Sequence, residues 1–242
     1  MRAVQNLMHD FSRLFFPHHC AGCGTDALNK EASICLRCLH ELPVTNFHQY
    51  AGNPVEKRLQ GRVQLVSATS YCYFTHQAMV QQLLHQLKYK GNQALGRQLG
   101  RMMGKVLQES DRFNDIDLLI PMPLHKAKER KRGYNQAEVL CEGMAEILGL
   151  PIINNAVIRV SDTETQTHKN RVERWQNMQG QFKLAQEGHR QSRTPRSIIE
   201  GKHLLLVDDV ITTGATLEAC ARVLLQAEGV RVSIATLAYA DN

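Results

Sequence analysis

Two adjacent carboxylates, Asp208 and Asp209, follow the apolar run 204–207 and precede a turn rich in hydroxyl groups. Four apolar residues in a row predict a strand buried on both faces, and open α/β sheets bind ligands beyond the carboxyl ends of such strands. Backbone N–H groups at the start of the next helix suit a phosphate, whereas neighbouring carboxylates suit vicinal hydroxyls. The pattern favours a ribose 5-phosphate, and the alternative is a buried strand before an ordinary capped helix. The turn comprises Thr212, Thr213, Gly214, Ala215 and Thr216.

A second anion site is predicted after the apolar run 117–120, which a proline-containing turn closes. Five lysines and arginines against the single acid Glu129 follow in 126–132, and clustered cations attract phosphates. Such a run can also be a solvated face, but its position after a strand and ahead of Asp208 favours a pyrophosphate site. The candidate residues are Pro121, Met122, Pro123, Leu124, Lys126, Arg130 and Arg132.

Four of the seven cysteines form two Cys-x-x-Cys pairs: Cys20, Cys23, Cys35 and Cys38. Two such knuckles can present four thiolates to one Zn²⁺, and metal binding would supply folding energy that a segment of about 40 residues lacks. The alternatives are a redox-active pair or four unliganded thiols. Isolated cysteines elsewhere and the absence of a secretory signal argue against a disulfide framework and predict a reducing, cytoplasmic location.

Strands alternate with helices along the remainder of the chain, which predicts βαβ units, an α/β fold and a mostly parallel sheet. We expect three parts: an N-terminal amphipathic helix and zinc module at 1–42, a connection at 43–62, and a main domain at 63–242. The expected strands are 63–68, 70–74, 117–120, 157–160, 204–207 and 230–238, and the expected helices are 77–87, 95–107, 137–148 and 214–228.

The composition excludes several classes of protein. The chain of 242 residues is 43% hydrophobic and 21% charged, as in ordinary globular proteins, which argues against a disordered or coiled-coil chain. No stretch approaches the roughly 18 apolar residues needed for membrane insertion. The net charge of +6 favours polyanionic ligands. Neither a Walker motif nor a Rossmann glycine motif is present in the sequence.

The run 204–216 resembles the phosphoribosyl pyrophosphate (PRPP) signature of type I phosphoribosyltransferases. Taken with 121–125 and 132–136 in the same order, and with the cysteine pairs, the chain resembles the ComF/GntX family of competence-associated proteins. The resemblance implies a type I phosphoribosyltransferase fold, a PRPP ligand with Mg²⁺, and catalytic roles for Asp208, Asp209 and Arg132. It also implies that a polar loop closes over PRPP, and the alternative for 161–181 is a surface helix. The loop candidates are Thr163, Gln166, Arg171 and Arg174.

Two functions fit these expectations. The first is transfer of 5-phosphoribose from PRPP to a nitrogen acceptor with release of pyrophosphate, as in nucleotide metabolism. The second is a non-catalytic protein of DNA uptake that senses PRPP or binds single-stranded DNA, with the zinc module recruiting DNA or a helicase-like protein partner. Pyrophosphate release and salt-dependent oligonucleotide binding distinguish the two.

Overall fold

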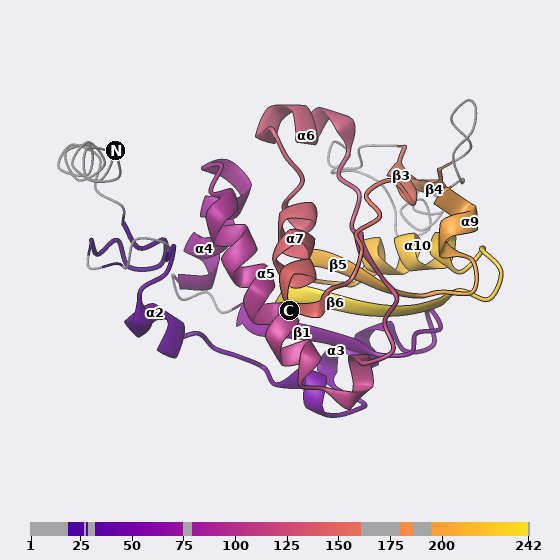
Figure 1. The fold of residues 1–242 in the computed structure, drawn as a ribbon, viewed down its shortest axis with the longest axis horizontal. Helices are drawn as coiled ribbons and strands as arrows, with labels where there is room; N and C mark the ends of the chain where they lie inside the picture. Colours follow the sequence, from indigo (N-terminus) through magenta and orange to yellow (C-terminus); the bar gives the residue numbers. More distant parts are fainter. Residues whose placement is uncertain are drawn as a thin grey trace, which may run out of the picture.

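The centre of the molecule is a four-stranded, entirely parallel sheet with the strand order β1-β6-β5-β2 (Figure 1). The computed structural model describes residues 19–26, 28, 32–74, 79–160, 180–185 and 195–241. The strands are β1 (Ala68–Phe74), β2 (Leu118–Pro121), β5 (His203–Ile211) and β6 (Arg231–Ala240). The expected α/β class with a mostly parallel sheet is confirmed.

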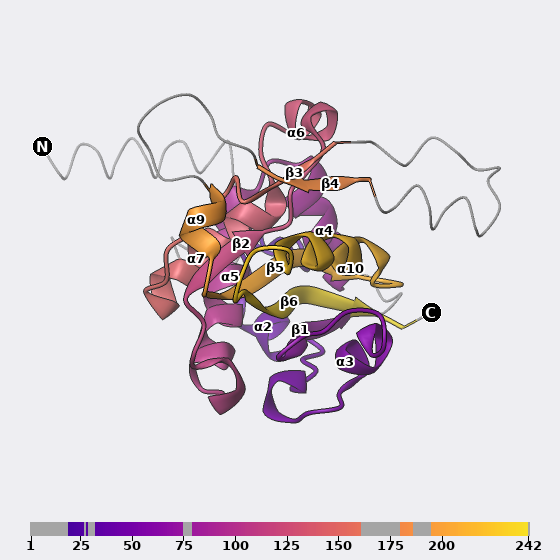
Figure 2. The same cartoon turned by 90° about the vertical axis from the view of Figure 1, so that its right-hand side faces the viewer.

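Helices cover both faces of this sheet because its central strands are apolar on both sides (Figure 2). Leu205 and Val207 pack against α4 (Met79–Tyr89), α5 (Gln93–Gln108) and α7 (Gln136–Leu148). Leu204 and Leu206 belong to the opposite core. That core includes α3 (Pro54–Leu59), α9 (Pro195–Ile199) and α10 (Ala215–Leu224).

Helices α5 and α7 touch through their backbones, because glycines replace side chains where they cross. A Cβ atom on Gly100 would lie 2.2 Å from the carbonyl oxygen of Leu140, and one on Gly143 would lie 2.1 Å from that of Arg97. Such distances are far inside van der Waals contact, so neither position accepts a side chain without separating the helices. The separation of α5 and α7 is thereby set by backbone contact.

The expected strand at 157–160 forms, but outside the main sheet. Strand β3 (Val157–Arg159) pairs antiparallel with β4 (Phe182–Leu184), which the sequence analysis did not predict. Val157 and Phe182 are buried in the core that α10 shares. The proposed loop residues Thr163, Gln166, Arg171 and Arg174 lie outside the described residues, as does the expected N-terminal helix.

The stretch 43–62, expected to be a connection, contributes to the core. Val44 forms an antiparallel bridge with Cys72, and the side chains of Phe47, Val55 and Leu59 are buried. Helix α3 starts at Pro54 and is capped by the side chain of Asn53, which accepts hydrogen bonds from two backbone N–H groups. The short segments here are η1 (Phe47–Gln49) and, further on, η2 (Asp111–Phe113).

The remaining differences concern one expected strand and the ends of other elements. The strand expected at 63–68 does not form, and the one expected at 70–74 starts earlier, at Ala68, as β1. Helix α10 ends at Leu224 rather than 228. Helix α6 (Lys126–Arg132) occupies the cationic run, and α2 (Leu36–His40) follows Cys35. Within the described part of the chain, no helix combines the length and apolar character that crossing a membrane requires.

Candidate functional site

A cavity of about 230 Å³ opens beyond the carboxyl end of β5 and contains the two adjacent carboxylates. Strand β5 continues past the expected end at Val207, because Asp208 and Val210 keep pairing with β6 through Thr236 and Ala238. The cavity is lined by the β5 end and the turn after it, by the segment after β2, and by parts of α4, α6, α7 and β3. Its lining residues are Lys88, Met122, Pro123, Leu124, Lys128, Arg132, Asn135, Gln136, Ala137, Arg159 and 208–217.

The carboxylate pair is held by its own backbone and by a cation from α4. The backbone N–H of Asp209 donates to Asp208 Oδ1 at 2.8 Å, and Lys88 Nζ lies 3.0 Å from Asp209 Oδ2. Burial and the neighbouring negative charge of Asp209 raise the pKa of Asp208 to about 7, against the opposing influence of Lys88 and Arg159. Ionisation of both carboxyl groups at once is therefore unfavourable. Cations or hydroxyl donors reaching Asp208 would favour its ionised form.

The turn after β5 directs the chain into α10 through a residue that only glycine suits. Gly214 has a φ of +75°, and a Cβ atom there would meet Leu59 Cδ2 at 2.8 Å. Helix α10 begins at the next residue, Ala215, so the first N–H groups of the helix lie at the cavity. All five proposed turn residues, 212–216, line the cavity together with the carboxylates.

Some of the proposed pyrophosphate residues line the cavity, whereas Pro121 is buried at the end of β2 and two cations of α6 point elsewhere. Met122, Pro123, Leu124 and Arg132 belong to the lining, whereas Pro121, Lys126 and Arg130 do not. Lys126 and Arg130 lie outside the lining because 126–132 is helical, and residues four apart in a helix lie on the same face. Lys128 and Arg132 share the face toward the cavity, and Arg130 Nε instead donates to the Lys126 carbonyl oxygen at 3.3 Å.

Asn135 joins the two walls of this part of the cavity. Its Oδ1 accepts the Ala137 backbone N–H at 3.1 Å and caps α7, while its Nδ2 donates to the Met122 carbonyl oxygen at 3.0 Å. Arg132 lies 5.4 Å from the centre of the Tyr89 ring at the end of α4. The segment after β2 is thereby hydrogen-bonded to the start of α7, and the end of α6 contacts the end of α4.

Lys88 and Arg159 are cavity residues that the sequence analysis missed. Together with Lys128 and Arg132 they bring four cations into the lining, against two carboxylates. Lys88 ends an amphipathic helix, where a lysine is ordinary. Arg159 interrupts the apolar run 157–160, and this single charge was the only available signal. The arrangement suits a ligand with several negative charges and a hydroxyl-bearing part.

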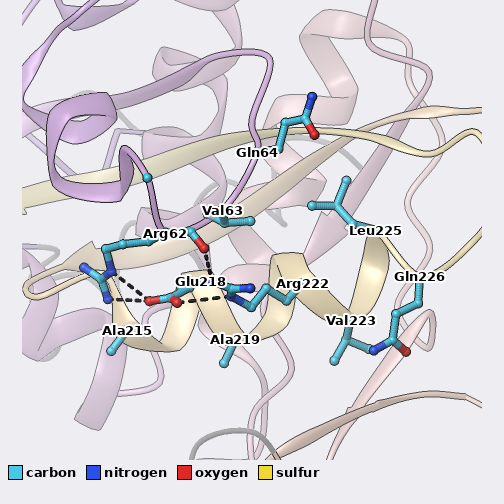
Figure 3. A pocket seen from close by; sticks show the side chains of 11 residues that line it. Arg62, Val63, Gln64, Ala215, Glu218, Ala219, Arg222, Val223, Leu225 and Gln226 are labelled. Atoms are coloured by element: carbon cyan, nitrogen blue, oxygen red, sulfur yellow. Dashed lines mark hydrogen bonds and ion pairs between the residues drawn. The ribbon is translucent and has the colours of Figure 1, made fainter. Parts of the chain in front are cut away.

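A larger hollow of about 840 Å³ lies along α10 and the loop 61–64 (Figure 3). Its charged groups are engaged with one another. Arg62 Nε and Arg222 Nε donate to the Glu218 carboxylate at 2.8 and 3.1 Å. The rest of its lining is largely aliphatic, so this hollow lacks the convergence of acids and cations found beside Asp208.

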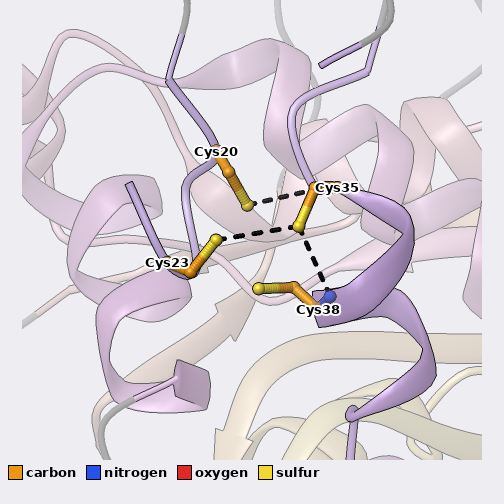
Figure 4. A group of neighbouring side chains, drawn as sticks. All are labelled: Cys20, Cys23, Cys35 and Cys38. Carbon is orange, nitrogen blue, oxygen red and sulfur yellow. Dashed lines mark hydrogen bonds between the residues drawn. The ribbon is translucent and has the colours of Figure 1, made fainter. Parts of the chain in front are cut away.

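The four cysteines converge on one point (Figure 4). Their sulfur atoms all lie within 4.8 Å of one another, and Cys23 Sγ is 3.7 Å from Cys35 Sγ. Four thiolates around one Zn²⁺ have sulfur atoms about 3.8 Å apart, so the spacing fits a tetrahedral site. The backbone N–H groups of Cys35 and Gly22 donate to Cys20 Sγ at 3.2 and 3.4 Å. Gly24, with a φ of +75°, forms the turn after the first pair. The cluster could hold a metal ion.

Comparisons with known proteins agree with this geometry. The model of the "Phosphoribosyl transferase domain" family matches residues 136–242, which include β5, the turn and α10. "Competence protein F" of Haemophilus influenzae is 32% identical over 145 residues, 59% of this chain and 60% of that protein. "DNA utilization protein YhgH" of Salmonella typhimurium is 28% identical over 210 residues, 86% and 84% of the two chains. "Competence protein ComFC" of Bacillus subtilis is 30% identical over 173 residues, 70% and 63% of the two chains.

These relatives and the domain match support the ComF family for this chain, with similarity to a phosphoribosyltransferase domain at residues 136–242. The aligned part spans less than two thirds of the Haemophilus influenzae member. Among solved structures, the glutamine PRPP amidotransferase of Bacillus subtilis is 22% identical, with a TM-score of 0.37, and the match covers 57% of this chain and 25% of that one. The fold of this chain rests on its own parallel sheet order and on the domain match at 136–242.

Proposed function

We propose that this chain binds PRPP in the cavity beside Asp208. The observation that carries the proposal is the joining of the Asp208–Asp209 pair and the turn 212–216 in one cavity with four cations. Asp208 and Asp209 would accept hydrogen bonds from the ribose hydroxyls. The N–H groups and hydroxyls of 212–216 would bind the 5-phosphate.

The diphosphate would lie against the segment after β2. Backbone groups of 122–124 and the cations Lys128 and Arg132 line that side and would stabilise the negative charge of pyrophosphate as it leaves. In the proposed transfer, the bond between C1 and the diphosphate oxygen breaks and its electron pair leaves with pyrophosphate. An acceptor nitrogen forms the new bond to C1 and loses a proton. Lys126 and Arg130 lie outside the lining and are not assigned to this step.

Mg²⁺ suits the donors at this site, because hard carboxylate and phosphate oxygens are its preferred ligands. Asp208 and Asp209 would hold it with the PRPP oxygens, and the ion would neutralise part of the diphosphate charge. The cation would compete with the proton on Asp208, whose pKa is raised to about 7 by burial and by the charge of Asp209.

We propose Zn²⁺ for the four-cysteine cluster. Cys20, Cys35 and Cys38 are buried in the same core as α4 and α5, so the metal would attach the N-terminal segment to the main domain. Atomic absorption on the purified chain is expected to find one zinc per chain. Replacing Cys38 with serine should lower that ratio well below one, whereas serine at the isolated Cys141 should leave it unchanged; zinc retained in full by Cys38→Ser would contradict the proposal.

The names of the relatives suggest a setting for this activity. "Competence protein F" and "DNA utilization protein YhgH" refer to the uptake and use of DNA. We propose that this chain also acts in DNA uptake or utilisation, as a cytoplasmic phosphoribosyltransferase. The second candidate, a non-catalytic PRPP sensor that binds single-stranded DNA or a helicase-like protein, is favoured by those names alone.

Calorimetry with PRPP and Mg²⁺ tests the binding proposal. Wild type should bind, and the double variant Asp208→Asn/Asp209→Asn should lose at least about 100-fold in affinity, because two hydrogen-bonded charges are removed. Asp115→Asn is the matched control, since Asp115 lies at the opposite end of β5. Binding at pH 7 should release protons, measurable in two buffers, as Asp208 becomes fully ionised. Equal affinity of wild type and the double variant would refute the assignment.

A further inference from the structure

Two arginines hold the turn after β5 from the side away from the cavity. Arg58 Nη1, in α3, donates to the carbonyl oxygen of Thr212. Arg62 Nη1, just after α3, donates to the carbonyl oxygen of Thr213 at 2.7 Å. Leu59, between the two arginines, packs against Gly214. Three side chains from one short segment thus contact three consecutive residues of the turn.

These contacts also determine where the neighbouring N–H groups point, because a peptide unit is rigid. A peptide unit is planar and trans, so its carbonyl oxygen and the N–H of the next residue point in opposite directions. The Thr212 carbonyl turned toward Arg58 therefore directs the N–H of Thr213 the other way, and the Thr213 carbonyl turned toward Arg62 does the same for the N–H of Gly214. Thr213 and Gly214 line the cavity whereas Arg58 and Arg62 do not, which is the arrangement expected if both N–H groups are directed toward the cavity.

We propose that Arg58 and Arg62 are positioning residues that hold the N–H groups of Thr213 and Gly214 toward a bound phosphate. The identity of that anion, the 5-phosphate of a phosphorylated ribose, rests on the function proposed above. A peptide unit free to rotate would at times place its carbonyl oxygen in the cavity, where it repels an anion. Each guanidinium stabilises the orientation that binds, and it does so without touching the ligand.

Both arginines are themselves well anchored. The Arg58 side chain is only 17% exposed. It donates to the Ala240 carbonyl oxygen at 2.6 Å and to the Tyr239 hydroxyl at 2.7 Å, and its guanidinium carbon lies 4.4 Å from the centre of the Tyr239 ring. Arg62 forms an ion pair with Glu218 of α10, 2.5 Å between Nη2 and Oε2 (Figure 3). The turn is thereby fixed to the end of β6 and to α10.

Arg222 provides a matched control, because it shares Glu218 with Arg62 but donates to the Arg62 carbonyl oxygen rather than to the turn. The variants are Arg62→Met, Arg58→Met, Arg58→Lys, Arg58→Met/Arg62→Met and Arg222→Met. The ligands are ribose 5-phosphate, inorganic phosphate and magnesium pyrophosphate, with affinity measured by calorimetry. Amide ¹⁵N–¹H signals of Thr213 and Gly214 report the orientation of the turn.

Arg62→Met should weaken ribose 5-phosphate binding about tenfold, the effect of losing one charge-assisted hydrogen bond. The double variant should lose more, and Arg58→Lys less than methionine at the same position. Magnesium pyrophosphate affinity should change by less than about twofold in all variants, as should every affinity of Arg222→Met. A merely structural role would lower the Tm of the arginine variants and leave the affinity of the folded fraction unchanged for every ligand.

The outcomes separate this inference from the proposed function. If wild type binds PRPP and the double variant binds ribose 5-phosphate as tightly as wild type does, the positioning role is overturned and the proposed function stands. Phosphate binding that shifts the Thr213 and Gly214 signals in wild type only, without PRPP binding, supports the positioning role and refutes the proposed function. Binding of no phosphate compound by wild type overturns both.

Discussion

The two ends of strand β5 both carry acidic and polar side chains, and the 230 Å³ cavity lies at the carboxyl end. At the amino end, His203 Nδ1 lies 3.0 Å from Asp115 Oδ1, and His203 Nε2 lies 2.9 Å from Ser233 Oγ. Ser233 Oγ also accepts the backbone N–H of Ser67 at 3.2 Å. The side chains of His203 and Ser233 are fully buried and hydrogen-bonded.

At the carboxyl end, Asp208 and Asp209 are only half-buried, repel each other and face the cavity. The amino end has the residue types of a serine nucleophile with its base and acid, yet its hydroxyl is buried where no substrate reaches it. Residue types alone therefore do not make a site. A perturbed group beside an accessible cavity is the better indicator of function.

Removing His203 should have the largest effect on stability. His203→Ala takes a fully buried ring from the core and leaves Ser233 without its imidazole partner, which should lower the free energy of unfolding by about 3 kcal/mol. Urea denaturation measures this loss. PRPP affinity of the folded variant should match wild type.

His85→Ala is the control, since His85 is exposed on α4 and its loss should cost no more than about 0.5 kcal/mol. A folded His203→Ala protein that no longer binds PRPP would show that the two ends of β5 are coupled and that the amino end contributes to binding.

A smaller effect concerns pH, and its sign should differ between the two ends. Burial lowers the pKa of His203 below 6.5, despite the opposing influence of Asp115. The unfolded chain then binds the proton more strongly, so this contribution to stability is lost as pH falls below 6.5. The pKa of Asp208 is raised from 3.8 to about 7, so its contribution is present at low pH and lost as pH rises toward 7.

Urea denaturation from pH 5 to 8 in the absence of ligand checks this difference. Asp208→Asn should raise the free energy of unfolding at pH 8 by about 1 to 2 kcal/mol, a value reduced to allow for partial solvent screening. His203→Gln should instead weaken the decline in stability below pH 6.5. Identical pH profiles for wild type and both variants would show that neither group differs between the folded and unfolded chains.

Local patterns in the sequence predicted the parts of the site that neighbouring residues determine. The apolar run before Asp208 and the glycine at 214 define a strand and turn without reference to the rest of the chain. The spacing of Cys20, Cys23, Cys35 and Cys38 likewise predicted the observed cluster. The turn candidates at 212–216 are also found in the lining.

The site residues that the sequence did not predict come from distant segments, which reach the site only through packing of the folded chain. Lys88 reaches Asp209 because α4 ends above the sheet edge, which no local pattern at Lys88 encodes. Arg58 and Arg62 lie in or beside a stretch expected to be a connection, since its composition gives no sign that it packs against 212–214. The cations at Lys126 and Arg130 were assigned together with Arg132 because a run of charges does not reveal which face a helix will present.

The backbone contact between α5 and α7 makes the shape of the cavity depend on two distant glycines. At Gly100 and Gly143, any replacement would push a carbonyl of the facing helix, so tolerated changes must accumulate elsewhere on these helices. Displacing α7 would also move Asn135 and Gln136, which begin it and line the cavity. A side chain at either glycine would therefore alter the wall of the cavity, although neither glycine lines it.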